Sequence, residues 1–264
     1  MKREVMPRKC MEETLAAFRE MCRIPGTDIP LPKSPGYTVL LTTIPHLLRT
    51  IFQYRYRGIH RVRRKGAVII AGNHTSHVDP FGVIPGIRRR THYLAKDAHF
   101  SKAFTAFIMR TTGQIRTHRE SGAADALSRA ADVLEAGLSM GIFPEGTRSR
   151  RTEAPFLSRG KTGVARLAAS FPDVPVHPTA ITGARDVMAP GDKMIRFWKR
   201  VGISYGEAIT WNDWIIAPAG GNQSESDLLA IIDAPAEEQR AALGELYRKF
   251  TDQLIASLAA LGAP

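Results

Sequence analysis

A short apolar run that ends in a polar cluster constrains this chain more than any other feature. The run Ala67-Val68-Ile69-Ile70-Ala71 is long enough for a buried strand, and residues 73–80 (Asn-His-Thr-Ser-His-Val-Asp-Pro) follow it after one glycine. The cluster is therefore expected at the exit of that strand. It holds His74 and Asp79, and a histidine held by a carboxylate is a common general base near neutral pH. We interpret the pair as a candidate base that activates a hydroxyl group.

Other interpretations of this cluster stay open at this point. Asp79-Pro80 is also a good helix start, with the carboxylate capping backbone N–H groups and proline at the first helical position. A purely structural role is a further alternative. His74, His77 and Asp79 could instead be zinc ligands, but no cysteine or further carboxylate lies close by in the sequence. We therefore predict no metal and no redox cofactor.

The order of apolar segments predicts an α/β fold, with a central mixed sheet, flanking helices and an N-terminal helical membrane-associating segment. The expected strands are 58–62, 67–71, 91–95, 138–143, 174–181 and one or two within 194–205. The expected helices are 11–22, 37–52, 101–112, 121–136, 160–170 and 236–261. Prolines within 174–181 favour an edge position or a strand end. We divide the chain into the N-terminal helical segment 1–57 and an α/β domain, 58–264, with a C-terminal helix.

The charge of the chain indicates an anionic partner. The net charge is +12 over 264 residues, and basic residues gather in 49–65, 88–90 and 148–151. Such a surface attracts nucleic acid, anionic lipid or phosphorylated substrates. The sequence has none of the common nucleic-acid-binding modules, so we predict no nucleic-acid partner. Cys10 and Cys22 are expected to be free thiols of a reducing compartment.

Residues 37–52 form the most apolar segment, which is too short to span a membrane and contains Pro45, His46 and Arg49. It fits either a core helix or an interfacial helix whose basic flank, 49–65, meets anionic headgroups. The side chains that the interfacial alternative turns toward lipid are Val39, Leu40, Leu41, Ile44, Leu47, Leu48, Ile51 and Phe52. The first thirty residues are polar, so no secretory signal peptide is expected.

A second polar cluster, 143–150 (Phe-Pro-Glu-Gly-Thr-Arg-Ser-Arg), also follows an expected strand. Its Pro-Glu-Gly turn could direct Glu145 and Arg148 into a cleft, and arginine binds two phosphate oxygens at once. An ordinary surface turn is the alternative. Between the two clusters lies a loop, 113–119 (Gly-Gln-Ile-Arg-Thr-His-Arg).

In this order and at these spacings, the clusters 73–80, 113–119 and 143–150, together with 174–183 (Val-Pro-Val-His-Pro-Thr-Ala-Ile-Thr-Gly), resemble the glycerolipid acyltransferase family. The resemblance covers roughly residues 58 to 210. It implies that His74 is the general base and that Asp79 orients it. It also implies a set of substrate-binding residues, which are Arg119, Glu145, Gly146, Thr147, Arg148 and Pro175, the last near the acyl donor.

The resemblance further implies transfer of a fatty acyl group from acyl-CoA or acyl carrier protein, as co-substrate, to a hydroxyl of a phosphorylated lysolipid. The expected acceptor is 1-acyl-glycerol-3-phosphate, which would give phosphatidic acid at the cytoplasmic face of a membrane, with the protein peripheral or monotopic on an anionic surface. Residues 116–118 (Arg-Thr-His) and His177 depart from the family pattern and leave the acceptor open. The alternatives are glycerol-3-phosphate or a glycolipid as acceptor, a non-catalytic membrane-binding module, and a metal-dependent hydrolase.

Overall fold

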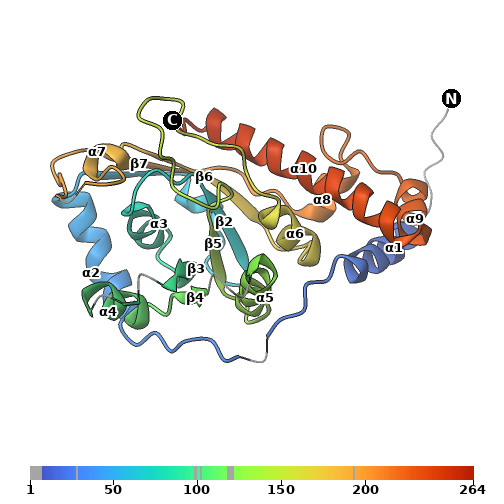
Figure 1. Cartoon of the computed structure of the whole chain (residues 1–264), viewed down its shortest axis with the longest axis horizontal. Helices are drawn as coiled ribbons and strands as arrows, with labels where there is room; N and C mark the ends of the chain where they lie inside the picture. The colour runs from blue at the N-terminus through green and yellow to red at the C-terminus, as the bar shows by residue number, and fades with distance from the viewer. Residues whose placement is uncertain (1–7, 28, 98–99, 102, 118–121, 193) are drawn as a thin grey trace.

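The computed structural model describes residues 8–27, 29–97, 100–101, 103–117, 122–192 and 194–264. Its centre is a seven-stranded sheet in the order β1-β7-β6-β2-β5-β3-β4 (Figure 1). Strands β6 and β7 pair antiparallel, and every other neighbouring pair is parallel. The predicted α/β fold with a central mixed sheet and flanking helices is confirmed.

The strands are β1 (Tyr54–Arg57), β2 (Val68–Gly72), β3 (Thr91–Lys96), β4 (Ile115–Thr117), β5 (Ser139–Ile142), β6 (Val176–Thr182) and β7 (Val201–Tyr205). The helices are α1 (Arg8–Met21), α2 (Tyr37–Thr50), α3 (Asp79–Ile87), α4 (Ala103–Thr111), α5 (Gly122–Glu135), α6 (Gly163–Ser170), α7 (Ala184–Val187), α8 (Trp211–Ile216), α9 (Glu225–Asp233) and α10 (Ala236–Ala260).

The middle strand β2 divides the core into two layers. All five of its residues are buried, as expected for a parallel strand covered on both faces. Ile69 and Ala71 pack in the cluster formed with α5, α6, α8 and α10. Val68 and Ile70 pack in the cluster formed with α2, α3 and α7. Burying a side chain such as that of Ile69 contributes about 1.5–3 kcal/mol, so this strand is a rigid base for the loop that follows it.

The strand expected at 58–62 is wrong, because the extended segment lies just before it. Strand β1 ends at Arg57, and a 3₁₀ turn, Ile59–Arg61, follows Gly58. Gly58 has φ +70°, and a Cβ there would lie 2.2 Å from the carbonyl oxygen of Tyr205. Glycine is therefore required where the chain leaves the sheet. Strand β1 belongs to the sheet, so only the part of segment 1–57 before Tyr54 is separate from it.

The edge position expected for 174–181 is also wrong, because β6 lies between β2 and β7. Pro178 has no N–H to donate, yet its carbonyl accepts the N–H of Gly206 at 2.8 Å. Gly206 is the first residue after β7, so the missing donor falls where the antiparallel ladder ends. A proline is tolerated at such a place inside a sheet.

Helix α2 turns most of its apolar side chains toward the protein. Leu48 is buried, and Ile44 and Phe52 are partly buried against the same cluster. Leu47 and Ile51 remain exposed. Much of the apolar stripe predicted to face lipid is thus core, while the side chains of Val39 and Leu40 lie outside the described residues. Among the helices of the described ranges, none is long and apolar enough to cross a membrane.

Candidate active site

The site is built on the loop that joins β2 to α3, at the carboxyl end of the central strands. In open α/β sheets this edge is where ligands bind. Asn73 anchors the loop to β6, because its side-chain amide donates to Ile181 O at 2.9 Å and its Oδ1 accepts the Ile181 N–H at 2.7 Å. The carbonyl of His74 accepts the N–H of Ser149 at 3.0 Å, which ties the loop to the segment after β5.

His74 and Asp79 are brought together as the sequence predicts. Nδ1 of His74 lies 2.8 Å from Oδ2 of Asp79. The same oxygen accepts the backbone N–H groups of Thr75 and Ser76, each at 2.8 Å. The Asp79 side chain is buried, so three donors hold an anion that water does not reach.

The expected cap at the start of α3 takes a different form. Asp79 is itself the first helical residue, and the N-cap position is Val78, whose side chain has no polar atom. The Asp79 carboxylate accepts from loop residues before the helix rather than from the first turn. Pro80 does lie in the first turn, where its missing N–H has no helical partner to lose. The carboxylate therefore shapes the His74 loop and orients the imidazole.

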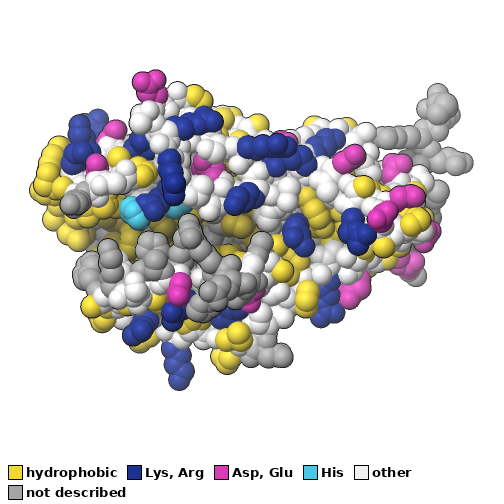
Figure 2. All heavy atoms as spheres, in the orientation of Figure 1, with side chains coloured by type: hydrophobic (Ala, Val, Ile, Leu, Met, Phe, Trp, Pro, Cys, Tyr) yellow, Lys and Arg dark blue, Asp and Glu magenta, His cyan; other side chains and the backbone are white. Residues whose placement is uncertain are grey.

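The imidazole of His74 is fixed on one face by an aromatic ring. The rings of His74 and Phe143 are stacked, with centroids 3.9 Å apart and planes 8° apart. Phe143 in turn stacks on Tyr93, at 5.2 Å. The His74 side chain keeps 18% of its surface exposed. Because Asp79 occupies Nδ1, the ring nitrogen left for a ligand is Nε2. Figure 2 shows histidine surface at the floor of a hollow beside basic side chains.

The Pro-Glu-Gly turn suggests that Glu145 points into an open cleft, but the structure does not place it there. Its side chain is buried, Oε1 accepts the N–H of His74 at 2.7 Å, and Oε2 accepts the N–H of Ser158 at 2.9 Å. Burial raises the pKa of Glu145, and the two N–H groups partly oppose that rise. The carboxylate thus holds two backbone segments together beside the base. The contact between Glu145 and the acceptor stays a prediction.

The next three motif residues lie at the surface beside the base. Gly146 (φ +70°) and Thr147 are exposed, and Arg148 is half-buried. Arg148 donates from Nη1 to Nε2 of His77. Burial lowers the pKa of Arg148, the carboxylate of Asp79 raises it, and the charge of Arg150 lowers it. The guanidinium therefore adds positive charge next to the His74–Asp79 pair.

One predicted site residue, Pro175, is not brought to this cluster. Pro175 is buried at the amino-terminal end of β6, where its carbonyl accepts the N–H of Ile69 at 2.9 Å. Ile69 precedes His74 by five residues, roughly 17 Å of extended chain. Pro175 therefore lies toward the amino-terminal ends of the parallel strands, opposite the end that carries His74. Arg119 lies outside the described residues.

Several residues that the sequence analysis did not single out support the site. Phe143 stacks on the base, and Ser158 receives Glu145. Ser76 donates its hydroxyl to the carbonyl of Met188 at 2.6 Å, which links the loop to the end of α7. Phe143 belongs to a quoted motif, so the motif could have singled it out, whereas Ser158 and Met188 carry no sequence signal.

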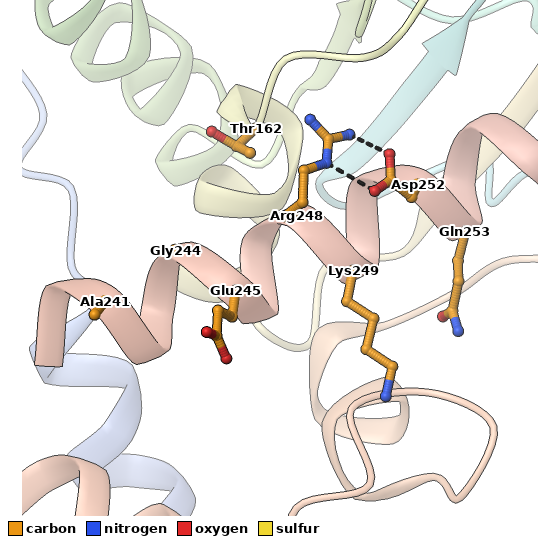
Figure 3. A pocket seen from close by; sticks show the side chains of 8 residues that line it. All are labelled: Thr162, Ala241, Gly244, Glu245, Arg248, Lys249, Asp252 and Gln253. Carbon is orange, nitrogen blue, oxygen red and sulfur yellow. Dashed lines mark hydrogen bonds and ion pairs between the residues drawn. The ribbon is translucent and has the colours of Figure 1, made fainter. Parts of the chain in front are cut away.

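The zinc ligands considered from the sequence already have protein partners. Nε2 of His77 contacts Arg148, and Nδ1 of His74 contacts Asp79. Over the described ranges, no group of three or more His, Cys, Asp or Glu side chains is arranged to hold a metal ion. A separate hollow lies along α10 and is lined by residues such as Thr162, Glu245 and Lys249. Arg248 and Asp252, which form an ion pair on α10, also line it (Figure 3). None of its lining residues belongs to the four motifs.

A histidine held by a buried carboxylate is suited to act as a general base on a hydroxyl group. Residues 53–182 match the family described as Acyltransferase. This match spans 130 of the 264 residues, and it supports the resemblance to the glycerolipid acyltransferase family that the motifs indicate.

Two known proteins are similar to this chain, one in sequence and the other in fold. The chain is 34% identical over 110 residues to a 1-acyl-sn-glycerol-3-phosphate acyltransferase of Borreliella burgdorferi, a match that covers 41% of this chain and 44% of that protein. The matched region thus spans less than half of the relative. The fold is similar to that of the 1-acyl-sn-glycerophosphate (LPA) acyltransferase PlsC of Thermotoga maritima, with a TM-score of 0.53 and 20% identity. That likeness covers 83% of this chain and 81% of the other.

Proposed function

We propose that this protein is an O-acyltransferase that moves a fatty acyl group from an acyl thioester to a hydroxyl of a phosphorylated lysolipid. The observation that carries the proposal is the 2.8 Å contact between His74 Nδ1 and a buried Asp79 carboxylate, with the other ring nitrogen left for a substrate. The acyltransferase match and the named relatives support 1-acyl-glycerol-3-phosphate as the acceptor. The product would then be phosphatidic acid.

In the proposed mechanism His74 acts as the general base. Nε2 takes the proton of the acceptor hydroxyl while that oxygen attacks the thioester carbonyl. The Asp79 carboxylate stabilises the imidazolium that forms. The tetrahedral intermediate collapses with cleavage of the C–S bond, and the leaving thiolate takes the proton back from His74. The acceptor is itself the nucleophile, so the reaction proceeds without an acyl-enzyme.

The basic residues next to the base suit a phosphorylated acceptor. Arg148 and Arg150 follow the exposed turn at Gly146, and Arg185 lies beside them, with Nη2 donating to the carbonyl of Arg151 at 2.6 Å. We propose that this charge, with the predicted contribution of Arg119, binds the acceptor phosphate. The donor is acyl-CoA or acyl carrier protein, and no metal or redox cofactor takes part.

We also propose that the protein works as a peripheral protein at the cytoplasmic face of an anionic membrane, where its lysolipid substrate resides. The net charge of +12 supports attraction to such a surface. The segment expected to associate with it includes α1 and α2.

An acceptor panel tests the proposal most economically. One acyl-CoA is offered with 1-acyl-glycerol-3-phosphate, glycerol-3-phosphate, a neutral lysolipid or a glycolipid, and lipid products are identified by mass spectrometry. Free thiol release measures turnover. The proposal predicts acceptor-dependent thiol release with phosphatidic acid as the main product. Thiol release with the glycolipid alone would reassign the acceptor, and none with any lysolipid would leave a membrane-binding module.

A further inference from the structure

A patch of exposed apolar side chains lies at one end of the molecule, outside the site described above. It combines the end of α2 with the loop after α7. The patch consists of Leu47 (39% exposed), Ile51 (53%), Met194 (69%), Ile195 (46%), Phe197 (50%) and Trp198 (52%). These are six of the eleven large apolar side chains that are exposed in the described part of the chain. Figure 2 shows this apolar surface gathered at the left end, over α2 and the loop beside α7.

The two halves of the patch touch each other. The rings of Phe52 and Phe197 meet edge to face, with centroids 6.3 Å apart. The side-chain amide of Gln53 donates to the carbonyl of Trp198 at 3.3 Å, and Arg200 Nε donates to Gln53 Oε1 at 3.4 Å. The loop is therefore held against the end of α2 and displays its aromatic rings outward from a fixed base.

Positive charge borders the patch. Arg49 and Arg55 from the α2–β1 segment and Lys199 and Arg200 from the loop are all exposed. Monomeric proteins rarely expose a contiguous apolar patch of this kind unless it binds a partner. Aromatic side chains rimmed by lysine and arginine match the interfacial zone of a bilayer, with acyl chains below and anionic headgroups around them.

We infer that the loop 194–198, together with Leu47 and Ile51, inserts into the surface of an anionic lipid bilayer. The loop is a second attachment point beside the helical N-terminal segment. The segment that joins α7 to this loop begins at Met188, whose carbonyl accepts the hydroxyl of Ser76 in the base-bearing loop, so insertion would bring His74 toward the membrane. Insertion of the loop would place a lipid surface next to the proposed active site. This consequence rests on the proposed function, whereas the insertion itself does not.

The chain carries its own reporter for this inference. Of its three tryptophans, Trp211 (1% exposed) and Trp214 (6%) lie in the core, and Trp198 is exposed. A change in tryptophan emission on adding vesicles therefore reports on position 198. Vesicles of phosphatidylglycerol with phosphatidylcholine should shift the emission to shorter wavelength, and brominated acyl chains should quench it. Phosphatidylcholine vesicles alone, or high salt, should weaken both effects because the basic rim is screened.

The variants Phe197→Ser and Trp198→Ser should each weaken partition into anionic vesicles about tenfold in a flotation assay, since each removes an exposed aromatic side chain that the bilayer would otherwise bury. The matched controls Ile216→Ser and Leu229→Ser change equally exposed apolar residues (43% each) on α8 and α9 and should leave partition unchanged. The Trp198→Phe variant should keep partition and lose the emission shift.

Acyl transfer to a short-chain acceptor below its micelle concentration separates this inference from the proposed function. The patch variants should keep that activity and lose activity on vesicle-borne acceptor. If the wild type shows no transfer to any acceptor but Trp198 still inserts, the function fails and the inference stands. Unchanged emission and unquenched Trp198 on anionic vesicles would overturn the inference. A dimer in solution that Trp198→Ser dissociates would also overturn it, because a second copy would then cover the patch.

Discussion

The backbone N–H of His74 donates to Oε1 of Glu145 at 2.7 Å, so the acid of one motif fixes the position of the base in another. The other oxygen of Glu145 holds Ser158. The Glu145 side chain is buried, and its two bonds link three segments of chain at the carboxyl ends of the strands. The base-bearing loop and the Pro-Glu-Gly turn are therefore coupled in space.

The variant Glu145→Gln should lose both stability and activity. An amide has one acceptor oxygen, so one of the two partly buried N–H groups that Glu145 holds loses its partner, which costs about 1–3 kcal/mol. Urea unfolding should show that loss, and acyl transfer should fall through a lower kcat because His74 is less well positioned. The exposed Glu153→Gln is the matched control. An unchanged kcat at full stability would remove the positioning role.

Gly58→Ala should destabilise the protein more than Gly66→Ala. Both glycines have positive φ, +70° and +81°, so both substitutions meet a similar backbone penalty of about 1 kcal/mol. At Gly58 the new Cβ would also lie 2.2 Å from Tyr205 O, whereas at Gly66 nothing lies within 4 Å. Denaturant unfolding measures the difference. Equal losses would mean that the turn after β1 can move away from β7.

Stability should fall as the pH drops below about 6.5, the ordinary pKa of histidine. Burial lowers the pKa of His92 and of His177, while each Nδ1–H donates to a carbonyl, of Gly113 at 2.7 Å and of Gly206 at 3.2 Å. Unfolded chains then bind more protons than the folded protein, so stability present above pH 6.5 is lost in acid.

The double variant His92→Gln/His177→Gln should flatten this dependence, which reaches at most about 1.4 kcal/mol per pH unit for each histidine. Urea unfolding between pH 5 and 7.5 measures it, and the exposed His60→Gln should leave the slope intact. A double variant with the wild-type slope would assign the acid sensitivity to other groups.

Much of the fold could be predicted from the sequence because its signals are local. The apolar run before His74 is a buried strand, and the spacing of Leu243, Leu246, Phe250 and Leu254 indicates a helix that the structure places at Ala236–Ala260. The position of β6 inside the sheet could not be predicted. Pro178 is tolerated there because the antiparallel pairing with β7 ends beside it, and a local pattern does not show where β7 ends. The pattern of α2 shows an apolar face but does not show that the protein itself covers most of it.

The candidate site was predictable where its residues are neighbours in sequence. His74 and Asp79 are five positions apart where the β2–α3 loop meets α3, and the structure shows them in contact. The clamp by Glu145 joins residues 71 positions apart, and the ring of Phe143 reaches His74 only once β2 and β5 are paired. Such contacts depend on strand order, which a local pattern does not contain.

Metal chelation should leave turnover unchanged. Nδ1 of His74 is engaged by Asp79 and Nε2 of His77 by Arg148, and the proposed mechanism uses neither nitrogen for a metal. Acyl transfer measured before and after dialysis against a chelator checks this point. Lost activity that zinc restores would return the metal-dependent alternative.

The proton transfer by His74 is tested most directly by the pH dependence and rate of acyl transfer in His74→Ala and Asp79→Asn, with folding checked by circular dichroism. Asp79→Asn should lower kcat by about 10²–10⁴ with little change in the acceptor KM, because the carboxylate stabilises the imidazolium. His74→Ala should reduce acceptor-dependent thiol release to background while vesicle binding persists. A folded His74→Ala protein that retains more than a few per cent of wild-type turnover would contradict the account.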